Sequence, residues 1–374
     1  MSFPGDRLER LAATGGLREL PGHRAGADFW SNDYLGLATD YAGQAPPAAL
    51  FPPAEAPPVG SRLISGDHAA YHELEARIAA FHGYPAALVF ASGYLANLGL
   101  LAALGQRTDT FLYDELSHAS CRDGLRLAAA RSLHYAHNDA ADLDRKLARA
   151  RPDGQRFVLT ESRFSMDGTV ADLDRLAEVC AAYGARLIVD EAHGVGLFGR
   201  RGRGLVHARG LAQRVFATVV TYGKAPGYHG AAVLGSADLR RYLVNHCRPF
   251  IYTTAPPPDY WAGLARTYDR LEREQPTRAA RLATVIAHWG RAVAAAGLSA
   301  HCPVQDGPIQ LVHLAGNERV MAAEAALSAA ALLVKGIRSP TVPAGRERLR
   351  VCLHAFNTAA EVDRLVAKLT ELCR

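Results

Sequence analysis

Leu187-Ile188-Val189-Asp190-Glu191-Ala192-His193-Gly194 is the stretch that decides the fold. It opens with three branched apolar residues, which is typical of a strand buried on both faces, and then becomes polar. Similar runs occur at Phe157–Glu161 and Val215–Thr221, with helical stretches along the chain between such runs. This alternation predicts a parallel sheet covered by helices on both faces. In such a sheet the carboxyl ends of the strands share one edge, where ligands collect.

The same alternation extends along the chain. Two further strands are expected at Ala87–Ala91 and Thr110–Tyr113. Helices are expected at Ala70–His82, Leu95–Leu104, Ser120–Ala129, Leu143–Ala150 and Leu173–Tyr183. After Pro256–Pro258 the pattern changes to a long helical region and three more strands, at Tyr260–Ala296, Ile309–His313, Leu332–Lys335 and Leu349–Leu353. A final helix is expected at Ala359–Cys373.

These patterns divide the 374 residues into three predicted parts. Residues 1–60 form an irregular segment rich in Pro and Gly, residues 61–258 form a large α/β domain, and residues 259–374 form a smaller α+β domain. A chain of this length can bury a large core and hold a cofactor.

Composition excludes several classes of protein. The net charge of +5 is spread through the chain, without the basic clusters and interleaved aromatics of a nucleic-acid surface. The longest apolar stretch, Leu95–Leu104, is too short to span a bilayer. The N-terminus carries Asp6 and Glu9 and lacks a signal peptide, and the six cysteines form no CxxC pair. We therefore expect a cytoplasmic protein that binds neither nucleic acid nor membrane and has no metal site.

Lys224 is the first candidate for chemistry. It follows the apolar run Val219-Val220-Thr221-Tyr222-Gly223, so it is expected at the ligand edge of the sheet. Desolvation there favours the neutral amine, which is the form that makes a Schiff base with pyridoxal 5′-phosphate (PLP). Alone, such a lysine is more often a surface residue just past a strand.

Asp190 and His193 strengthen this interpretation. PLP catalysis needs a carboxylate beside the pyridinium nitrogen, because the protonated ring acts as an electron sink. Asp190 ends an apolar strand and suits that position, and His193 could donate to the phenolic oxygen of the cofactor. A helix N-cap and a structural histidine are the alternative interpretations. An aspartate and a lysine on two such strands favour the PLP site.

Three further segments follow expected strands. Ser92-Gly93-Tyr94 leads into a helix whose N-terminus suits a phosphate, to which Thr221 would add a hydroxyl. His118, in Asp114–Ser120, could stack on the pyridine ring or be a buried structural histidine. Ser165, in Glu161–Gly168, could reach the cofactor, whereas Asp167-Gly168 is expected to form only a turn.

With these residues in place, the chain resembles the α-oxoamine synthases, which are fold-type I PLP enzymes. The matching segments run in family order over nearly the whole chain: Ser31–Leu37, Ser61–Gly66, Leu116–Ser120, Phe164–Gly168, Asp190–Gly194, Thr221–Lys224 and Pro340–Gly345. The resemblance implies a large, mostly parallel sheet domain and a smaller C-terminal α+β domain. It also implies a homodimer.

The resemblance implies roles for individual residues. Lys224, Asp190, His193 and His118 would be catalytic, with His118 also touching the substrate. Cofactor contacts would come from Gly93, Tyr94, Thr221, Glu161 and Ser165, and from Thr253 or Thr254 of the partner subunit. Substrate would be bound by Arg350 and Asn32 at the amino-acid carboxylate, and by Thr341 and Arg18.

The implied substrates are an amino acid and an acyl thioester. The likeness is strongest to the branch that joins L-alanine to pimeloyl-CoA or pimeloyl-carrier protein, with decarboxylation, to give 8-amino-7-oxononanoate in biotin synthesis. A sister enzyme using glycine or serine with another acyl-CoA would share the catalytic set. An aminotransferase or lyase would share the lysine and aspartate but would not require Leu116–Ser120 or Pro340–Gly345. A non-catalytic scaffold would leave the lysine, aspartate and histidine without a purpose.

The sequence departs from this family in two segments. The Gly-rich segment before Ser61 is shortened to Pro57-Pro58-Val59-Gly60, and Ala225-Pro226-Gly227-Tyr228-His229-Gly230 follows the lysine where many relatives have small residues. Both departures, with a short N-terminus, bear on the entry of the substrate and on the shape of the acyl chain.

Overall fold

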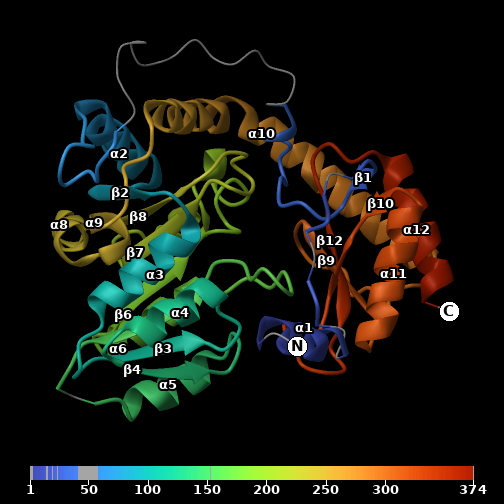
Figure 1. The fold of residues 1–374 in the computed structure, drawn as a ribbon, viewed down its shortest axis with the longest axis horizontal. Helices are drawn as coiled ribbons and strands as arrows, with labels where there is room; N and C mark the ends of the chain where they lie inside the picture. The colour runs from blue at the N-terminus through green and yellow to red at the C-terminus, as the bar shows by residue number, and fades with distance from the viewer. Residues whose placement is uncertain are drawn as a thin grey trace. The chain divides into compact units, whose positions relative to one another are not determined.

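The computed structural model describes residues 3–13, 16–18, 20–22, 24–40, 58–151 and 153–373. They belong to two compact units (Figure 1). The larger unit comprises residues 35–165 and 169–277, and the smaller comprises residues 1–34, 166–168 and 278–374. The division at residues 60 and 258 that we inferred from the sequence stays a prediction, and Pro57 of the shortened segment lies outside the described residues.

A seven-stranded sheet forms the centre of the larger unit. Its order is β2-β8-β7-β6-β5-β3-β4, and every neighbouring pair is parallel except those that involve β8. The strands are β2 (Ala86–Phe90), β3 (Thr110–Asp114), β4 (Arg131–Tyr135), β5 (Arg156–Glu161), β6 (Arg186–Asp190), β7 (Val215–Thr221) and β8 (Ala231–Gly235). The predicted, mostly parallel sheet is therefore confirmed.

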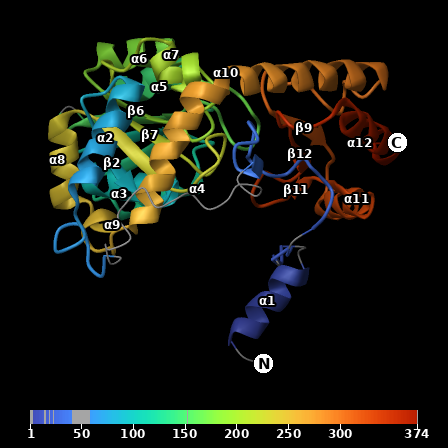
Figure 2. The ribbon, with the colours of Figure 1, turned by 90° about the horizontal axis from the view of Figure 1, so that it is seen from above.

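Helices cover both faces of this sheet (Figure 2). One face carries α3 (Gly93–Leu104), α4 (Ala119–Leu127), α8 (Ala237–His246) and α9 (Arg248–Ile251), and the other carries α5 (Ala140–Ala148) and α6 (Leu173–Ala182). Leu100, Phe111 and Val219 are fully buried in the core beneath the first group. Each such side chain contributes roughly 1.5–3 kcal/mol when it leaves water. The remaining helical segments of this unit are α2 (Ala69–His82), the single turn η2 (Arg200–Gly202) and α7 (Leu205–Ala208).

Side-chain caps fix where several helices begin. The hydroxyl of Ser92 accepts the N–H of Leu95 at 3.3 Å at the start of α3. Asp172 does the same for Arg175 at the start of α6, at 3.1 Å. Such caps satisfy N–H groups that the helix itself cannot, which is why short polar residues stand at these positions.

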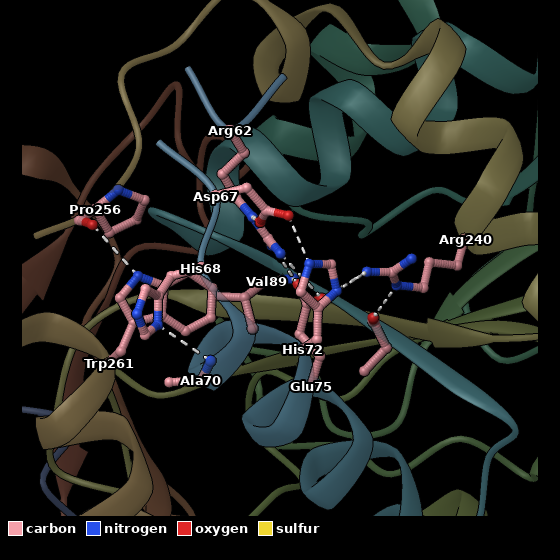
Figure 3. Close-up of polar contacts among 11 residues, drawn as sticks. Arg62, Asp67, His68, Ala70, His72, Glu75, Val89, Arg240, Pro256 and Trp261 are labelled. Carbon is pink, nitrogen blue, oxygen red and sulfur yellow. Dashed lines mark hydrogen bonds and ion pairs between the residues drawn. The ribbon is translucent and has the colours of Figure 1, made fainter. Parts of the chain in front are cut away.

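A buried ion network joins the segment Ser61–Gly66 to α2, β2 and α8 (Figure 3). Glu75 lies at its centre, where it pairs with Arg62 at 2.6 Å and Arg240 at 2.8 Å and accepts the N–H of Val89 at 2.9 Å. Asp67 also pairs with Arg62, at 2.7 Å. Burial lowers the pKa of Arg62, but the charges and hydrogen bonds of Glu75 and Asp67 together outweigh it and hold that pKa above its ordinary value. The network therefore keeps its charges and fixes four separate pieces of chain.

The smaller unit combines residues 278–374 with N-terminal residues. Its sheet has the order β11-β12-β9 and is antiparallel, and β1 pairs with β10 in a separate parallel ladder. The strands are β1 (Ala27–Asp28), β9 (Ile309–His313), β10 (Leu332–Leu333), β11 (Lys335–Ile337) and β12 (Arg348–Cys352), with helices α1 (Phe3–Ala13), α11 (Asn317–Ala329) and α12 (Ala359–Leu372). The long helix α10 (Pro258–Ala295) contributes residues to both units.

Two expectations about secondary structure were wrong. The N-terminal segment is not irregular throughout, because α1 forms there; Pro4 fits a first helical turn, and Asp6 favours it electrostatically. The expected strand Leu332–Lys335 is two strands, β10 and β11, which pair with different partners. β4, β8, α8 and α11 have no counterpart among the elements expected from the sequence.

Two general features concern the whole described chain. All six cysteines are free, and five of them are buried. Within the described ranges, no helix combines the length and the apolar character that a bilayer crossing requires.

Candidate active site

A cavity of about 200 Å³ opens where the strands of the larger sheet end. Eight of the predicted site residues line it: Gly93, Tyr94, His118, Glu161, Asp190, His193, Thr221 and Lys224. Asn97, Ser120 and Gly223 also line it, although none of them is among the site residues predicted from the sequence. Ser165 is buried but does not line the cavity, and neither do Thr253 and Thr254, which were assigned to a partner subunit.

Asp190 is delivered to this cavity by the last residue of β6. Its side chain is 3% exposed, and both of its oxygens accept hydrogen bonds. Oδ1 accepts the N–H of Ala192 at 2.8 Å, and Oδ2 accepts an amide N–H of Asn97 at 2.7 Å. Two donors thus hold the buried carboxylate in a fixed orientation at the cavity wall.

Lys224 lies on the hairpin between β7 and β8. The two stems are joined where the N–H of Tyr222 donates to the carbonyl of Gly230 at 2.9 Å. A tight turn follows the lysine, since the N–H of Gly227 donates to its carbonyl at 2.8 Å and Gly227 has φ +71°. Antiparallel β8 thereby returns His229 and Gly230 to the same cavity. The unusual segment after the lysine thus forms part of the cavity wall.

The turn from β2 into α3 makes a site suited to a phosphate. Ser92 caps the third residue of the helix, which leaves the N-terminal N–H groups of Gly93 and Tyr94 directed outward. A Cβ on Gly93 would lie 2.5 Å from Cγ2 of Thr221. Glycine is therefore required for the turn to approach β7, and the Thr221 side chain lies beside it at the cavity.

His118 is the N-cap of α4, and its ring is exposed at the cavity. Its Nδ1 accepts the N–H of Ser120 at 3.2 Å and lies 2.8 Å from the Ser120 hydroxyl. Desolvation by its neighbours lowers the pKa of His118, and the Lys224 charge lowers it further, against the opposing effect of Asp190. An open, uncharged imidazole ring is suited to stacking on a flat aromatic ligand.

Glu161 holds the His118 loop in place. It is the last residue of β5, is 3% exposed, and accepts the N–H of His118 at 2.7 Å. Burial raises the pKa of the Glu161 carboxyl well above its ordinary value, and the Asp190 charge raises it further. Glu161 therefore supports the cavity without adding a second full charge beside Asp190.

The residues predicted to bind the amino-acid carboxylate lie in the smaller unit. Arg350, in β12, donates to Oδ1 of Asn32 at 3.0 Å and to the Tyr34 hydroxyl at 3.2 Å. It is 7% exposed, so these two neighbours fix its guanidinium. The structure thus brings Arg350 and Asn32 together, as their predicted shared role requires.

Arg18 and Thr341 also come together in the smaller unit. Both line a groove of about 740 Å³, with Trp30 and Arg338. They are predicted substrate contacts that lie far apart in the sequence, so their shared groove is a feature of the fold.

The cavity residues fit PLP. The outward N–H groups at Gly93 suit its phosphate, the charged Asp190 suits its ring nitrogen, and Lys224 supplies an amine. No group of three or more His, Cys, Asp or Glu side chains in the described part of the chain is placed to hold a metal ion.

Comparison with known proteins identifies the family. The model of the "aminotransferase class I and II" family matches residues 27–369. The chain belongs to this family. Within the aminotransferase class I and II family, the chain is 42% identical to the 8-amino-7-oxononanoate synthase of Marinobacter nauticus, over 92% of this chain and 86% of that one.

Solved structures agree with the aminotransferase class I and II assignment. A serine palmitoyltransferase variant from S. paucimobilis, with PLP and myriocin bound, is 27% identical with a TM-score of 0.87, covering 99% of this chain and 96% of that one. An 8-amino-7-oxononanoate synthase from Francisella tularensis is 28% identical with a TM-score of 0.77, covering 92% and 97%. The fold expected from the sequence, a PLP-dependent transferase of fold type I, is confirmed.

Glu161→Gln tests the state of the buried carboxyl. Because folding raises the pKa of Glu161, its ionisation costs stability, and the wild-type protein should lose stability relative to Glu161→Gln as pH rises above about 4.3, the unfolded value. A tenfold change in the proton affinity of this carboxyl corresponds to about 1.4 kcal/mol in the free energy of unfolding. Thermal unfolding of the cofactor-free proteins from about pH 5 to 8 measures the difference. Glu178→Gln, on the surface of α6, is the control, and parallel curves for wild type and Glu161→Gln would contradict the assignment.

Proposed function

We propose that this chain is a PLP-dependent acyltransferase that condenses L-alanine with a pimeloyl thioester, of CoA or of a carrier protein, to give 8-amino-7-oxononanoate, CO₂ and the free thiol. The observation that carries the proposal is the likeness to 8-amino-7-oxononanoate synthase over nearly the whole chain, joined to a cavity that contains Lys224, Asp190 and His193. Its free cysteines suit a reducing compartment, so we place the reaction in the cytoplasm.

Bound PLP supplies an electron sink that stabilises negative charge on the α-carbon of an amino acid. Asp190 serves this chemistry by holding a negative charge where the ring nitrogen is protonated. His193, which is buried at the same wall, would donate to the phenolic oxygen of the cofactor. His118 would stack on the ring.

Lys224 has two tasks in this proposal. Its Nζ would hold the cofactor, and its amine would accept the α-proton of the amino acid. The hairpin that carries it is fixed at both stems, so the amine stays at the cavity between these two tasks. In the proposed reaction the α-carbon would form a bond to the acyl carbon, the thiol would leave, and the amino-acid carboxyl group would be lost as CO₂.

Arg350 binds the carboxylate of the amino acid. Asn32 and Tyr34 orient its guanidinium by accepting from the same nitrogen, Nη2. An arginine presents parallel N–H groups that match a carboxylate. The groove that contains Arg18 and Thr341 is assigned to the acyl donor.

A second candidate is a sister enzyme that condenses serine with a long acyl-CoA. The likeness to serine palmitoyltransferase, with a TM-score of 0.87, favours it. The same catalytic residues would serve both reactions, so the choice depends on the side chain of the amino acid and on the acyl group.

We further propose that the chain works as a homodimer, in which Thr253 or Thr254 contacts the cofactor phosphate of the partner subunit. Large apolar side chains stand exposed at the cavity residue Tyr94 and in two other segments. These two segments are joined by the hydrogen bond from the Ala255 N–H to the carbonyl of Gly60. The exposed side chains are Leu63, Ile64, Tyr94 and Tyr252, and Ile64 is 84% exposed. A partner subunit over them would remove an apolar surface from water.

The molar mass in solution tests the dimer. The chain weighs 40.1 kDa, so light scattering should give twice this mass at micromolar concentration. Ile64→Asp should shift the population toward monomer, whereas Leu127→Asp, at the C-terminal end of α4, should not. A wild-type protein that stays monomeric would overturn the proposal.

A substrate panel tests the reaction. Purified protein with PLP should be yellow and should release thiol fastest with L-alanine and a pimeloyl thioester. Lys224→Ala should lose at least about a thousandfold in rate, because it removes both the anchor and the base. Faster thiol release with glycine or serine would favour a sister enzyme. Unchanged activity in the Lys224→Ala protein would contradict the role of Lys224 as anchor and base.

Arg350→Ala tests carboxylate binding. The KM for L-alanine should rise by roughly ten- to a hundredfold, because a charge-assisted pair contributes about 1.5–3 kcal/mol. The KM for the acyl donor should change much less. Arg364→Ala, on the exposed face of α12, is the control. An unchanged KM for L-alanine in Arg350→Ala would contradict the role.

A further inference from the structure

Asn97 is a buried amide within an apolar helix. In α3 it is surrounded by the sequence Gly93-Tyr94-Leu95-Ala96 and Leu98-Gly99-Leu100-Leu101, and it is 3% exposed. Its Nδ2 lies 2.7 Å from Oδ2 of Asp190 and 3.0 Å from the hydroxyl of Ser120. One side chain thus links the buried carboxylate to α4.

The hydrogen atoms along this chain of contacts can be assigned. The Asp190 carboxylate can only accept, so Asn97 donates one N–H to it and the second to Ser120. With its oxygen accepting from Asn97, Ser120 directs its own hydrogen to Nδ1 of His118 at 2.8 Å. Nδ1 also accepts the backbone N–H of Ser120 at 3.2 Å. With both donors on Nδ1, the proton of His118 resides on Nε2.

We propose that Asn97 is a positioning residue that holds the Asp190 carboxylate charged and oriented toward the cofactor ring and, through Ser120, fixes His118 as its neutral Nε2–H form. This inference rests on the proposed binding of PLP. It goes beyond that function, because it assigns a role to Asn97. The two amide hydrogens of this side chain hold Asp190 directly and His118 through Ser120, and both of these groups are expected to flank the ring.

The energetic reason lies in the burial of Asp190. Without Asn97, Oδ2 would lose its 2.7 Å donor, and Oδ1 would keep only Ala192 N–H. A buried charge that loses a charge-assisted hydrogen bond is less stable and is neutralised more readily. The charge that pairs with the cofactor nitrogen would then be weaker, and PLP would bind less tightly.

Asn97→Leu removes the donors while keeping a similar shape. We expect its dissociation constant for PLP to rise about tenfold or more, and acid-induced release of PLP to move to higher pH than in wild type. The readouts are equilibrium binding of PLP and the pH dependence of its visible absorption. Circular dichroism and thermal unfolding of the cofactor-free protein show whether the variant is folded.

Asn97→Asp gives a change of opposite sign. At low pH the introduced carboxyl keeps one proton and can donate it to Asp190, because the ionisation of both of two adjacent carboxyls is unfavourable. As pH rises it becomes a second charge and repels Asp190. PLP binding by this variant should therefore improve as pH falls, whereas that of Asn97→Leu should worsen. A purely structural role for Asn97 would not produce this inversion.

Two controls separate the parts of the proposal. Ser120→Ala keeps the bond from Asn97 to Asp190 and should leave PLP affinity within about twofold of wild type. It should alter the pH dependence of the absorption, because His118 Nδ1 loses its hydroxyl donor. Gln310→Ala removes a buried amide in the smaller unit and should affect stability only.

The outcomes test the role of Asn97 and the proposed reaction separately. Unchanged PLP affinity and an unchanged pH profile in folded Asn97→Leu, or parallel pH profiles for Asn97→Leu and Asn97→Asp, would overturn the role of Asn97. The readout is PLP binding, so a protein that binds PLP but releases no thiol from a pimeloyl thioester would overturn the proposed reaction and leave the Asn97 result standing. A wild-type protein that binds no PLP would overturn both.

Discussion

A negative charge held inside the protein is the constraint on which the larger unit depends. The Asp190 carboxylate is 3% exposed, and a charge at such depth persists only while donors surround it. One donor is the backbone N–H of Ala192, two residues further along the chain, and the other is the side-chain amide of Asn97 in α3. The neighbouring acid, Glu161, has its pKa raised by burial and by Asp190, so the cavity is built to carry one charge of this sign.

This constraint explains why the cavity lies at the end of the strands. Parallel strands bring Glu161 and Asp190 to adjacent positions, as the pairing of these two residues in β5 and β6 shows. The helices that begin at this edge add N–H groups and caps, from Ser92 at α3 and His118 at α4. A carboxylate, a phosphate-binding turn and an imidazole thus meet because the chain crosses back over the sheet after each strand.

The sequence was informative where one pattern dominated. Strands such as Leu187–Asp190 are apolar on both faces, and the predicted bounds differ from those of β6 by one residue. β4 was missed because Arg131–Tyr135 is a half-exposed edge strand with polar residues, and β8 because Ala231–Gly235 consists mostly of small residues. Asn97 was missed for a different reason: its role depends on Asp190 and Ser120, which are 93 and 23 residues away. The available signal was a lone amide in an apolar helix, since such a group needs a buried partner.

The antiparallel hairpin that carries Lys224 limits how this protein can vary in length. Both stems belong to the same sheet, and the bond from Tyr222 to Gly230 closes the loop between them. A residue inserted between Thr221 and Lys224 would push the lysine along by about 3.3 Å relative to β7. Substitutions in the Ala225–Gly230 segment can change the cavity wall directly, because His229 and Gly230 line it. Changes in specificity at this wall would have to come by substitution, and insertions are better tolerated in the surface connections behind the sheet.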